Sequence, residues 1–359
     1  AFLRFIHIDT RSEFLGDQGR TSIIMHRWFH NGEIPLSGPT TLTGQHLGPV
    51  FYYLLVPAQL VGSNFPIIAA VWLSLIGVFA VAMLFHTVRM VYGNAAALVV
   101  ALLFAVSPVI AQGDRTIWEP NLVPLFTILF AYFAIRQHHH VGFLDNVGLG
   151  AASAILVQLH YPNLYFLGLV AVLFVGHSIR VRQWDTLLRA SAGWILGFVV
   201  CIFPFIVYET GNGFRDIREI LQIIYTGTSG IGKRAALANS IDYAGRIFGF
   251  VLPGITTGVS VGLLAIWSVF LMLRFNSWNI FWTSWFAIGL LIMARYNGVV
   301  FDHYLLFLLT PVLFGVASVY RWGEQIPLVR WALFSLLVLV VGLQIYRNDL
   351  WRPGYGDLA

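Results

Sequence analysis

The sequence predicts an all-α polytopic membrane protein, a bundle of about 10–11 transmembrane helices with interfacial helices in its first outer loop. Three observations lead to this fold class. Of the 359 residues, 58% are hydrophobic and only 10% are charged, against about 25% charged in an ordinary soluble domain. The mean hydropathy is +0.77. The uncharged runs 247–273 and 275–294 are long enough to cross about 30 Å of hydrocarbon, so a soluble fold is excluded.

Hydropathy divides the chain into four parts. Residues 1–8 are too short to span a bilayer, and we expect them to be the end of a truncated first transmembrane helix. Residues 9–65 form the first extracytoplasmic loop, 66–346 the transmembrane bundle and 347–359 an extracytoplasmic tail. Within the bundle the apolar runs predict ten complete spans, at 66–88, 94–112, 120–136, 147–160, 163–178, 190–208, 248–273, 276–294, 303–320 and 329–346.

Two stretches of the first loop have helical character, although the loop is too polar to cross a membrane. They cover residues 20–30 and 50–61. Trp28, Tyr52 and Tyr53 supply the aromatic anchors that favour the headgroup layer. We therefore expect two interfacial helices before the first complete span.

The charges of the loops predict the orientation of the bundle. When the loops are assigned alternately to two sides, one side holds eight basic and three acidic residues, and the other holds thirteen of each. The first set is Arg89, Arg136, Arg180, Arg182, Arg189, Arg274, Arg321, Arg330, Asp145, Asp185 and Glu324. By the positive-inside rule this side is cytoplasmic, so the first loop and a second long loop at 209–246 face outward. The count also favours two spans at 147–160 and 163–178 over one helix broken at Pro162.

Polar residues gather in the loops that are predicted to face outward, and charges are nearly absent from the middles of the spans, where they are costly. The outer set is Asp9, Arg11, Glu13, Asp17, Arg20, Arg27, Asp114, Arg115, Glu119, Arg215, Arg218, Lys233, Arg234, Arg295, Asp302 and His303. Such a mixture of carboxylates and cations suits a reaction on a charged headgroup whose tail stays in lipid. The single cysteine, Cys201, allows neither an intrachain disulfide nor a cysteine metal site.

The first loop carries the most specific motif of the chain. The run FLGDQGRTSIIMHRWFHNGEIPLSGPTT, followed by LGPVFYYLLVP and a long apolar helix, resembles the first outer loop of the bacterial family 39 glycosyltransferases. These are polyprenyl-phosphate-dependent membrane enzymes of the GT-C class, related to the protein O-mannosyltransferases (the PMT family) and to the aminoarabinose transferase that modifies lipid A. Shorter matches follow at Ser107-Pro108, Trp118-Glu119-Pro120-Asn121, His160-Tyr161 and His303-Tyr304.

The resemblance implies roles for two acids. Asp17 takes the place of the first-loop acid, the catalytic base of the family, which accepts the proton of an acceptor hydroxyl or amine as it attacks the sugar C1 with inversion. The alternative is that Asp17 caps the helix that begins near Gly19. Glu119-Pro120 matches a second acid before a proline, with a longer side chain than the usual Asp. Its alternative is an ordinary solvated loop acid.

His46 and a set of cations complete the predicted site. His46 stands near the place where some relatives carry a Glu-Lys-Pro-Pro run, from which residues 45–49 depart. Headgroup binding, metal binding and capping of a turn are its three alternatives. Because the leaving group is a phosphate, cationic side chains should line its exit. The candidates are Arg20, Arg115, Arg295, Lys233 and Arg234, and Asp114, His303 and Tyr304 complete the substrate-binding set.

Three further patterns predict no site. Residues 138–140 are consecutive histidines, which converge poorly on one ion, and residues 227–233 lack the spacing of a Walker motif. Aromatic residues at helical spacing predict a packing or lipid-facing surface, namely Trp278, Trp282, Trp285 and Phe286. No cofactor is predicted. A divalent metal is unsupported, because Asp17 is followed by Gln18 and Gly19 rather than by a second acid.

The sequence therefore predicts a multi-pass glycosyltransferase of the bacterial inner (cytoplasmic) membrane, acting in the cell envelope. It would move a sugar from a polyprenyl-phosphate donor to a lipid, glycan or protein acceptor at the outer face, and nucleic acid is not an expected partner. The alternatives are a transporter or flippase of lipid-linked sugars and a GT-C glycan ligase or polymerase. A transporter should carry polar residues along a path at mid-membrane depth, and this chain has few.

Overall fold

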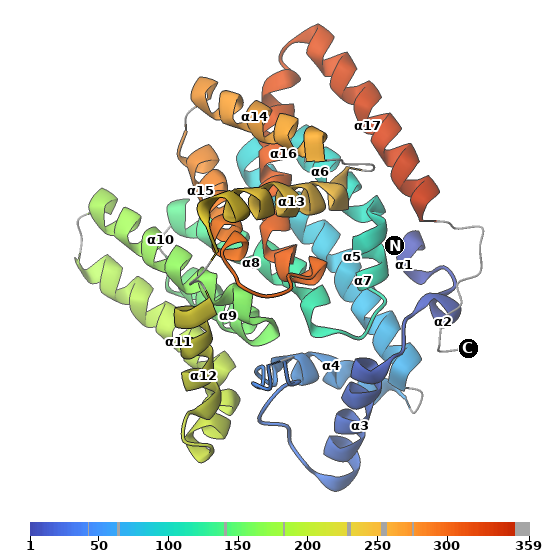
Figure 1. The fold of residues 1–359 in the computed structure, drawn as a ribbon, viewed down its shortest axis with the longest axis vertical. Coiled ribbons are helices and arrows are strands. Elements are labelled where there is room, and N and C mark those ends of the chain that lie inside the picture. The colour runs from blue at the N-terminus through green and yellow to red at the C-terminus, as the bar shows by residue number, and fades with distance from the viewer. Residues whose placement is uncertain are drawn as a thin grey trace.

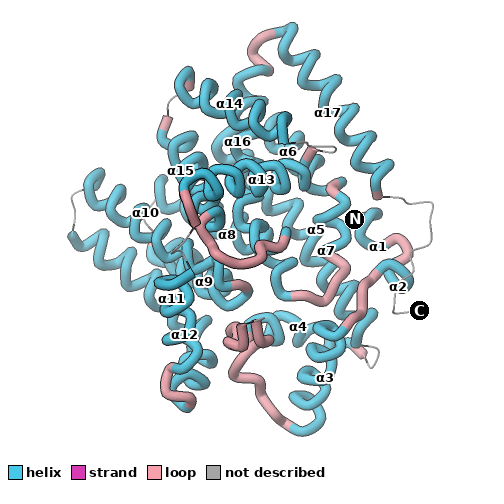
Figure 2. The backbone as a smooth tube through the Cα atoms, in the orientation of Figure 1, coloured by secondary structure: helices cyan, strands magenta, loops and turns pink. Residues whose placement is uncertain are grey.

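The computed structural model describes residues 1–41, 43–62, 65–139, 142–181, 184–227, 231–252, 257–274 and 276–348. Figure 1 and Figure 2 show that the regular structure in these ranges is helical. The one strand-type pairing within them is an isolated bridge between Thr40 and His46. The all-α prediction is therefore confirmed. Most of the predicted tail, residues 349–359, lies outside the described residues.

Among the described residues, five helices are long and apolar enough to cross a bilayer. They are α5 (Phe65–Tyr92), α11 (Trp184–Gly211), α15 (Ser277–Ala294), the joined η3 (Asp302–Leu308) and α16 (Leu309–Gly323), and α17 (Pro327–Arg347). Shorter apolar helices accompany them, namely α6 (Asn94–Val106), α8 (Val123–His139), α9 (Phe143–Leu159), α10 (Tyr165–Val181) and α14 (Thr257–Leu273). The chain is thus a polytopic helical bundle, as predicted.

The predicted span 94–112 is two helices rather than one. α6 ends at Val106, and α7 (Pro108–Gly113) begins after a single residue. Pro108 offers no N–H and disfavours a helical backbone at Ser107, whose ψ is 121°. The Ser107 hydroxyl donates a hydrogen bond to the carbonyl of Phe250 at 2.5 Å, so the break also ties α7 to a distant helix.

The predicted span 248–273 is also broken. α13 (Lys233–Val251) ends at Leu252, which is extended (φ −118°, ψ 120°), and α14 begins at Thr257. Leu252 precedes a proline in the sequence, and a residue before proline is driven out of the helical region. In Figure 1, α13 runs across the bundle while α16 and α5 run along it. The predicted span had therefore merged the end of α13 with α14.

Two glycines set the spacing between α9 and α11. A Cβ at Gly150 would lie 2.0 Å from the carbonyl oxygen of Trp194, and one at Gly197 would lie 2.0 Å from that of Val147. Small residues let membrane helices approach this closely. His160, at the end of α9, is extended with ψ 134°, so α9 and α10 are two helices separated by the predicted turn.

The first loop lies at one end of the bundle, at the bottom of Figure 1, together with α12 (Arg215–Gly227). Its two longer helices are α3 (Gly16–Asn31) and α4 (Val50–Val61), and the short helices α1 (Phe2–Phe5) and α2 (Ile8–Arg11) precede them beside the N-terminus. α4 matches its prediction, whereas α3 starts four residues earlier than expected. The Leu15 N–H donates to Gln18 Oε1 at 2.8 Å, which caps the earlier start.

The aromatic residues of α15 form a packing surface, one of the two roles predicted for them. Trp282 and Trp285 are fully buried. The Trp285 indole N–H donates to the carbonyl of Phe307 at 3.1 Å, and the ring of Trp282 packs 4.0 Å from that of Phe314. These contacts fix α15 against η3 and α16.

Candidate functional site

One face of α3 carries the residues with the strongest sequence signal. Asp17, Arg20, Ile24 and Arg27 are three or four residues apart and therefore lie on the same side of the helix. Arg20 Nη2 lies 3.4 Å from Asp17 Oδ1, and both side chains are about half exposed. Asp17 also lies in the first turn of α3, where the helix dipole favours a carboxylate.

A polar cavity of about 350 Å³ opens beside this face. We call it the α3 cavity. Its walls are α3, the loop that follows α3 and Tyr52 of α4. Its polar lining includes Arg20, Arg27, Glu33 and His46. Arg27 makes no ion pair with any described residue, so its guanidinium is available to an anion in the cavity.

Glu119 lies close to the same group of residues. It begins the short helix η1 (Glu119–Leu122) and is buried. The pKa of the Glu119 carboxyl is raised to about 7, chiefly by burial and also by the Asp17 carboxylate, while a backbone hydrogen bond and Arg20 oppose the shift. Tyr52, which lines the α3 cavity, interacts electrostatically with all three residues. The structure therefore brings Glu119, predicted from the second outer loop, into electrostatic contact with Asp17 and Arg20 of the first loop.

His46 belongs to a network between the first loop and α12. Its Nδ1 lies 2.9 Å from Asp216 Oδ2 and 2.9 Å from the Tyr208 hydroxyl. The His46 backbone N–H also donates to Asp216 Oδ2, at 3.1 Å. Next to it, Gln45 Nε2 donates to Glu219 Oε2 at 2.9 Å. These contacts fasten the wall of the α3 cavity to α12.

Asp114 is committed to a different partner. Its Oδ2 accepts a hydrogen bond from Arg4 Nε at 2.7 Å, and both side chains are buried. Burial raises the pKa of Asp114 to about 6, and the Arg4 guanidinium opposes that shift. Arg4 also donates to the carbonyl of Ala105 at 2.9 Å. The pair therefore holds α1 against the break between α6 and α7.

Arg115 is buried and does not line the α3 cavity. Its Nη2 donates to Gln112 Oε1 at 2.6 Å, while Nε and Nη1 have no hydrogen-bond partner among the described residues. Burial lowers the pKa of Arg115 to about 10, helped by Arg11 and Arg4. The side chain therefore stays cationic at neutral pH.

His303 and Tyr304 lie on η3 in an aromatic cluster. The ring of His303 is 4.3 Å from that of Trp118, and the ring of Tyr304 is 4.5 Å from that of His160. His303 and Trp118 line a second cavity of about 170 Å³. Trp118 belongs to a motif noted in the sequence, yet nothing there marked it as a site residue, because its partner is 185 positions away.

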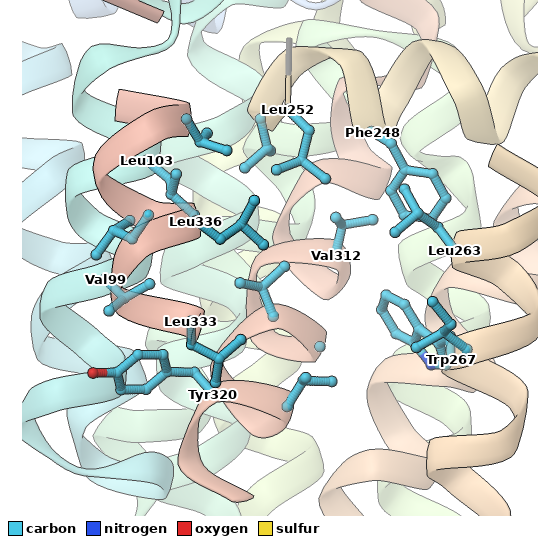
Figure 3. Close-up of a pocket in the computed structure, with 17 residues that line it drawn as sticks. Val99, Leu103, Phe248, Leu252, Leu263, Trp267, Val312, Tyr320, Leu333 and Leu336 are labelled. Carbon is cyan, nitrogen blue, oxygen red and sulfur yellow. The ribbon is translucent and has the colours of Figure 1, made fainter. Parts of the chain in front are cut away.

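A third cavity, of about 210 Å³, is apolar. Figure 3 shows its side chains pointing inward from α6, α13, α14, α16 and α17. It is lined by residues such as Leu103, Phe248, Leu263, Val312 and Leu336. No predicted site residue lines it.

Two solved structures of ArnT from Cupriavidus metallidurans are similar to this chain. The structure bound to undecaprenyl phosphate matches with a TM-score of 0.64 at 15% sequence identity, over 90% of this chain and 60% of ArnT. The apo structure matches with a TM-score of 0.60 at 16% identity, over 90% of this chain and 59% of ArnT. The chain has the fold of ArnT. No protein-family model and no curated protein sequence matches it.

The likeness to ArnT confirms the predicted GT-C-type helical fold. This chain spans about 60% of the length of ArnT, and the likeness concerns the fold alone. Within this ArnT-like fold, three predicted cations lie apart from the α3 cavity. Arg295 caps the C-terminus of α15, and Lys233 and Arg234 begin α13; all three are exposed.

No three His, Cys, Asp or Glu side chains in the described part of the chain lie close enough to hold a metal ion. Two patterns set aside in the sequence fall partly outside that part. These are the histidine triplet, at residue 140, and the glycine-containing loop, at residues 228–230.

Proposed function

We propose that this protein is a membrane glycosyltransferase that moves a sugar from a polyprenyl-phosphate donor to an acceptor at the outer face of the bacterial inner membrane. The observation that carries the proposal is the grouping of Asp17, Arg20 and Glu119 beside a polar cavity, at the end of an apolar helical bundle. The fold of ArnT, solved with undecaprenyl phosphate bound, supports the choice of donor.

The transfer needs a base and a stabilised leaving group. Asp17 accepts the proton of the acceptor hydroxyl or amine while the acceptor atom bonds to the sugar C1. The bond between C1 and the phosphate oxygen breaks with its electrons on that oxygen, so C1 is inverted. Arg20 and Arg27 lie on the same helix face and would pair with the phosphate that is released.

Glu119 would assist as a hydrogen-bond donor. With a pKa of about 7, it is about half protonated at neutral pH. A protonated Glu119 can donate to a hydroxyl or phosphate oxygen of the donor. It also avoids placing a second negative charge next to Asp17, which therefore remains the proton acceptor.

The membrane location follows from the donor. Each buried CH₂ group of an acyl or isoprenoid chain contributes about 0.8 kcal/mol to membrane binding, so the tail of a polyprenyl phosphate stays in the bilayer. Only its headgroup reaches a site at the end of the bundle. The same reasoning applies to a lipid-linked acceptor.

The direct test is Asp17→Asn in purified protein supplied with labelled undecaprenyl-phosphate sugars. Loss of a general base lowers transfer by about 10²–10⁴-fold, and binding of undecaprenyl phosphate should be retained. Asp9→Asn, an exposed acid on α2, is the matched control and should keep wild-type transfer. Unchanged transfer by Asp17→Asn would contradict the role of Asp17. Wild-type protein that moves these lipids across a vesicle bilayer without transferring sugar would favour a flippase instead.

A further inference from the structure

The second cavity has no part in the mechanism above, although it is built of residues that recognise polar ligands. It lies between α7, η1, the end of α13 and η3, and its volume is about 170 Å³. Trp118, Asn121, Asp302 and His303 give it polar groups, and Ile110 and Leu306 give it apolar ones.

The rings of this cavity form a wall. His303 lies 4.3 Å from Trp118 at an angle of 60°, and it stacks on Phe301 at 5.6 Å. Neither the Trp118 indole N–H nor the His303 ring makes a hydrogen bond to a described residue. A purely apolar ligand would leave these donors and acceptors without partners, which is unfavourable in a partly buried site.

The carboxylates of the cavity are already neutralised. Arg4 binds Asp114, and Arg246 Nε donates to Asp302 Oδ1 at 2.6 Å. The wall therefore presents oxygen acceptors without a strong net charge. A neutral ligand with several hydroxyl groups and an apolar C–H face satisfies both the ring wall and the polar atoms. A sugar ring has this chemistry.

The position of the cavity connects it to the proposed reaction. Trp118 directly precedes Glu119, and Glu119 interacts electrostatically with Asp17 and Arg20. A sugar held against Trp118 would thus lie beside the residue that precedes Glu119, the proposed hydrogen-bond donor to the sugar-phosphate.

We propose that this cavity, the Trp118 subsite, binds the sugar ring of the polyprenyl-phosphate donor. The inference rests on the proposed function and adds the place where the sugar is recognised. In this arrangement Trp118 and His303 contact the face of the ring, and Asn121 and Asp302 bind its hydroxyl groups. The phosphate lies toward Arg20.

The test compares lipids with and without a sugar. The affinity of the full-length protein is measured for undecaprenyl phosphate and for the same lipid carrying glucose, mannose or arabinose. Trp118→Ala should weaken binding of the best glycosylated lipid by about tenfold, because it removes an aromatic contact. It should change binding of undecaprenyl phosphate less than twofold. Trp118→Phe, which keeps a ring, should fall between Trp118→Ala and wild type.

The matched control is Trp331→Ala, an exposed tryptophan on α17, which should leave both affinities unchanged. Equal weakening of both lipids by Trp118→Ala would show a structural role and overturn the subsite. So would a wild-type protein that binds no glycosylated lipid more tightly than undecaprenyl phosphate. Either result leaves the proposed function standing. A wild-type protein that binds none of these lipids would overturn the proposed function itself.

Discussion

Two cavities at opposite ends of the same bundle differ in the polarity of the side chains that line them. The α3 cavity, at the bottom of Figure 1, is lined by two arginines, a glutamate and a histidine among other residues. The apolar cavity, among the helices at the top of Figure 1 and enlarged in Figure 3, is lined almost wholly by aliphatic and aromatic side chains. Of these two cavities, only the α3 cavity offers groups that can move a proton or hold a phosphate, so chemistry on a charged headgroup is expected at that end and not in the apolar cavity.

The two regions also differ in the interactions that hold their helices together. Outside the apolar cavity, polar contacts join segments that are far apart in sequence. His46, which lines the α3 cavity, pairs with Asp216, and Asp114, which lines the second cavity, pairs with Arg4. Around the apolar cavity the contacts are mainly those of hydrocarbon packing. Substitutions of these paired charges should therefore have large effects, and substitutions of exposed charges should have small ones.

The largest effect is expected from Arg4→Met. It leaves Asp114 buried without its partner, which costs about 3–5 kcal/mol, so the thermal unfolding midpoint should fall by several degrees. Arg321→Met breaks an exposed ion pair with Glu324, for which about 0–1 kcal/mol is expected. Adding Asp114→Leu to Arg4→Met should restore most of the loss. Equal midpoints for the two single variants would contradict the expected difference between the buried and the exposed ion pair.

Glu119→Gln should change the dependence on pH. The pKa of this carboxyl rises from 4.5 to about 7 on folding, so its contribution to stability is full below about pH 4.5 and is lost as the pH rises through 7. The loss amounts to about 3 kcal/mol. The wild-type unfolding midpoint should therefore fall as the pH rises from about 4.5 to 7. The Glu119→Gln variant should not show this contribution to the fall.

The same variant tests the role of Glu119 in transfer. The amide keeps a hydrogen-bond donor, so transfer should fall less than about tenfold and should no longer titrate near pH 7. Glu13→Gln, an exposed acid of the first loop, serves as the control and should keep the wild-type pH profile. A profile in Glu119→Gln that still titrates near pH 7 would assign that titration to another group.

The sequence predicted the helices well where hydropathy alone decides them. α4 and α17 lie within two residues of their expected bounds. It missed the breaks at Ser107 and Leu252, because each lies inside an apolar run and depends on the proline that follows. Composition averaged over a window does not register a single residue of this kind.

The candidate site was predictable only in part. Asp17, Arg20 and Glu119 carry motif signals of their own, and the structure groups them. His46 was identified without its partners, since Asp216 is 170 residues away. The partner of Asp114 is 110 residues away. Pairings over such distances depend on how the helices pack, and local sequence patterns do not contain that information.

The smallest effect is expected from Asp216→Asn, which weakens the contact of α12 with the first loop. The amide oxygen can still accept from His46, but the charge is lost, which costs about 1–2 kcal/mol locally. Hydrogen exchange of residues 40–48 should therefore speed up by roughly tenfold, because local opening becomes easier. Asp242→Asn, an exposed acid of α13, should leave it unchanged. The apolar cavity shares no residue with this network, so exchange around Val312 should not move. Faster exchange around Val312 in Asp216→Asn would show that the two ends are energetically coupled and would contradict the view that they are independent.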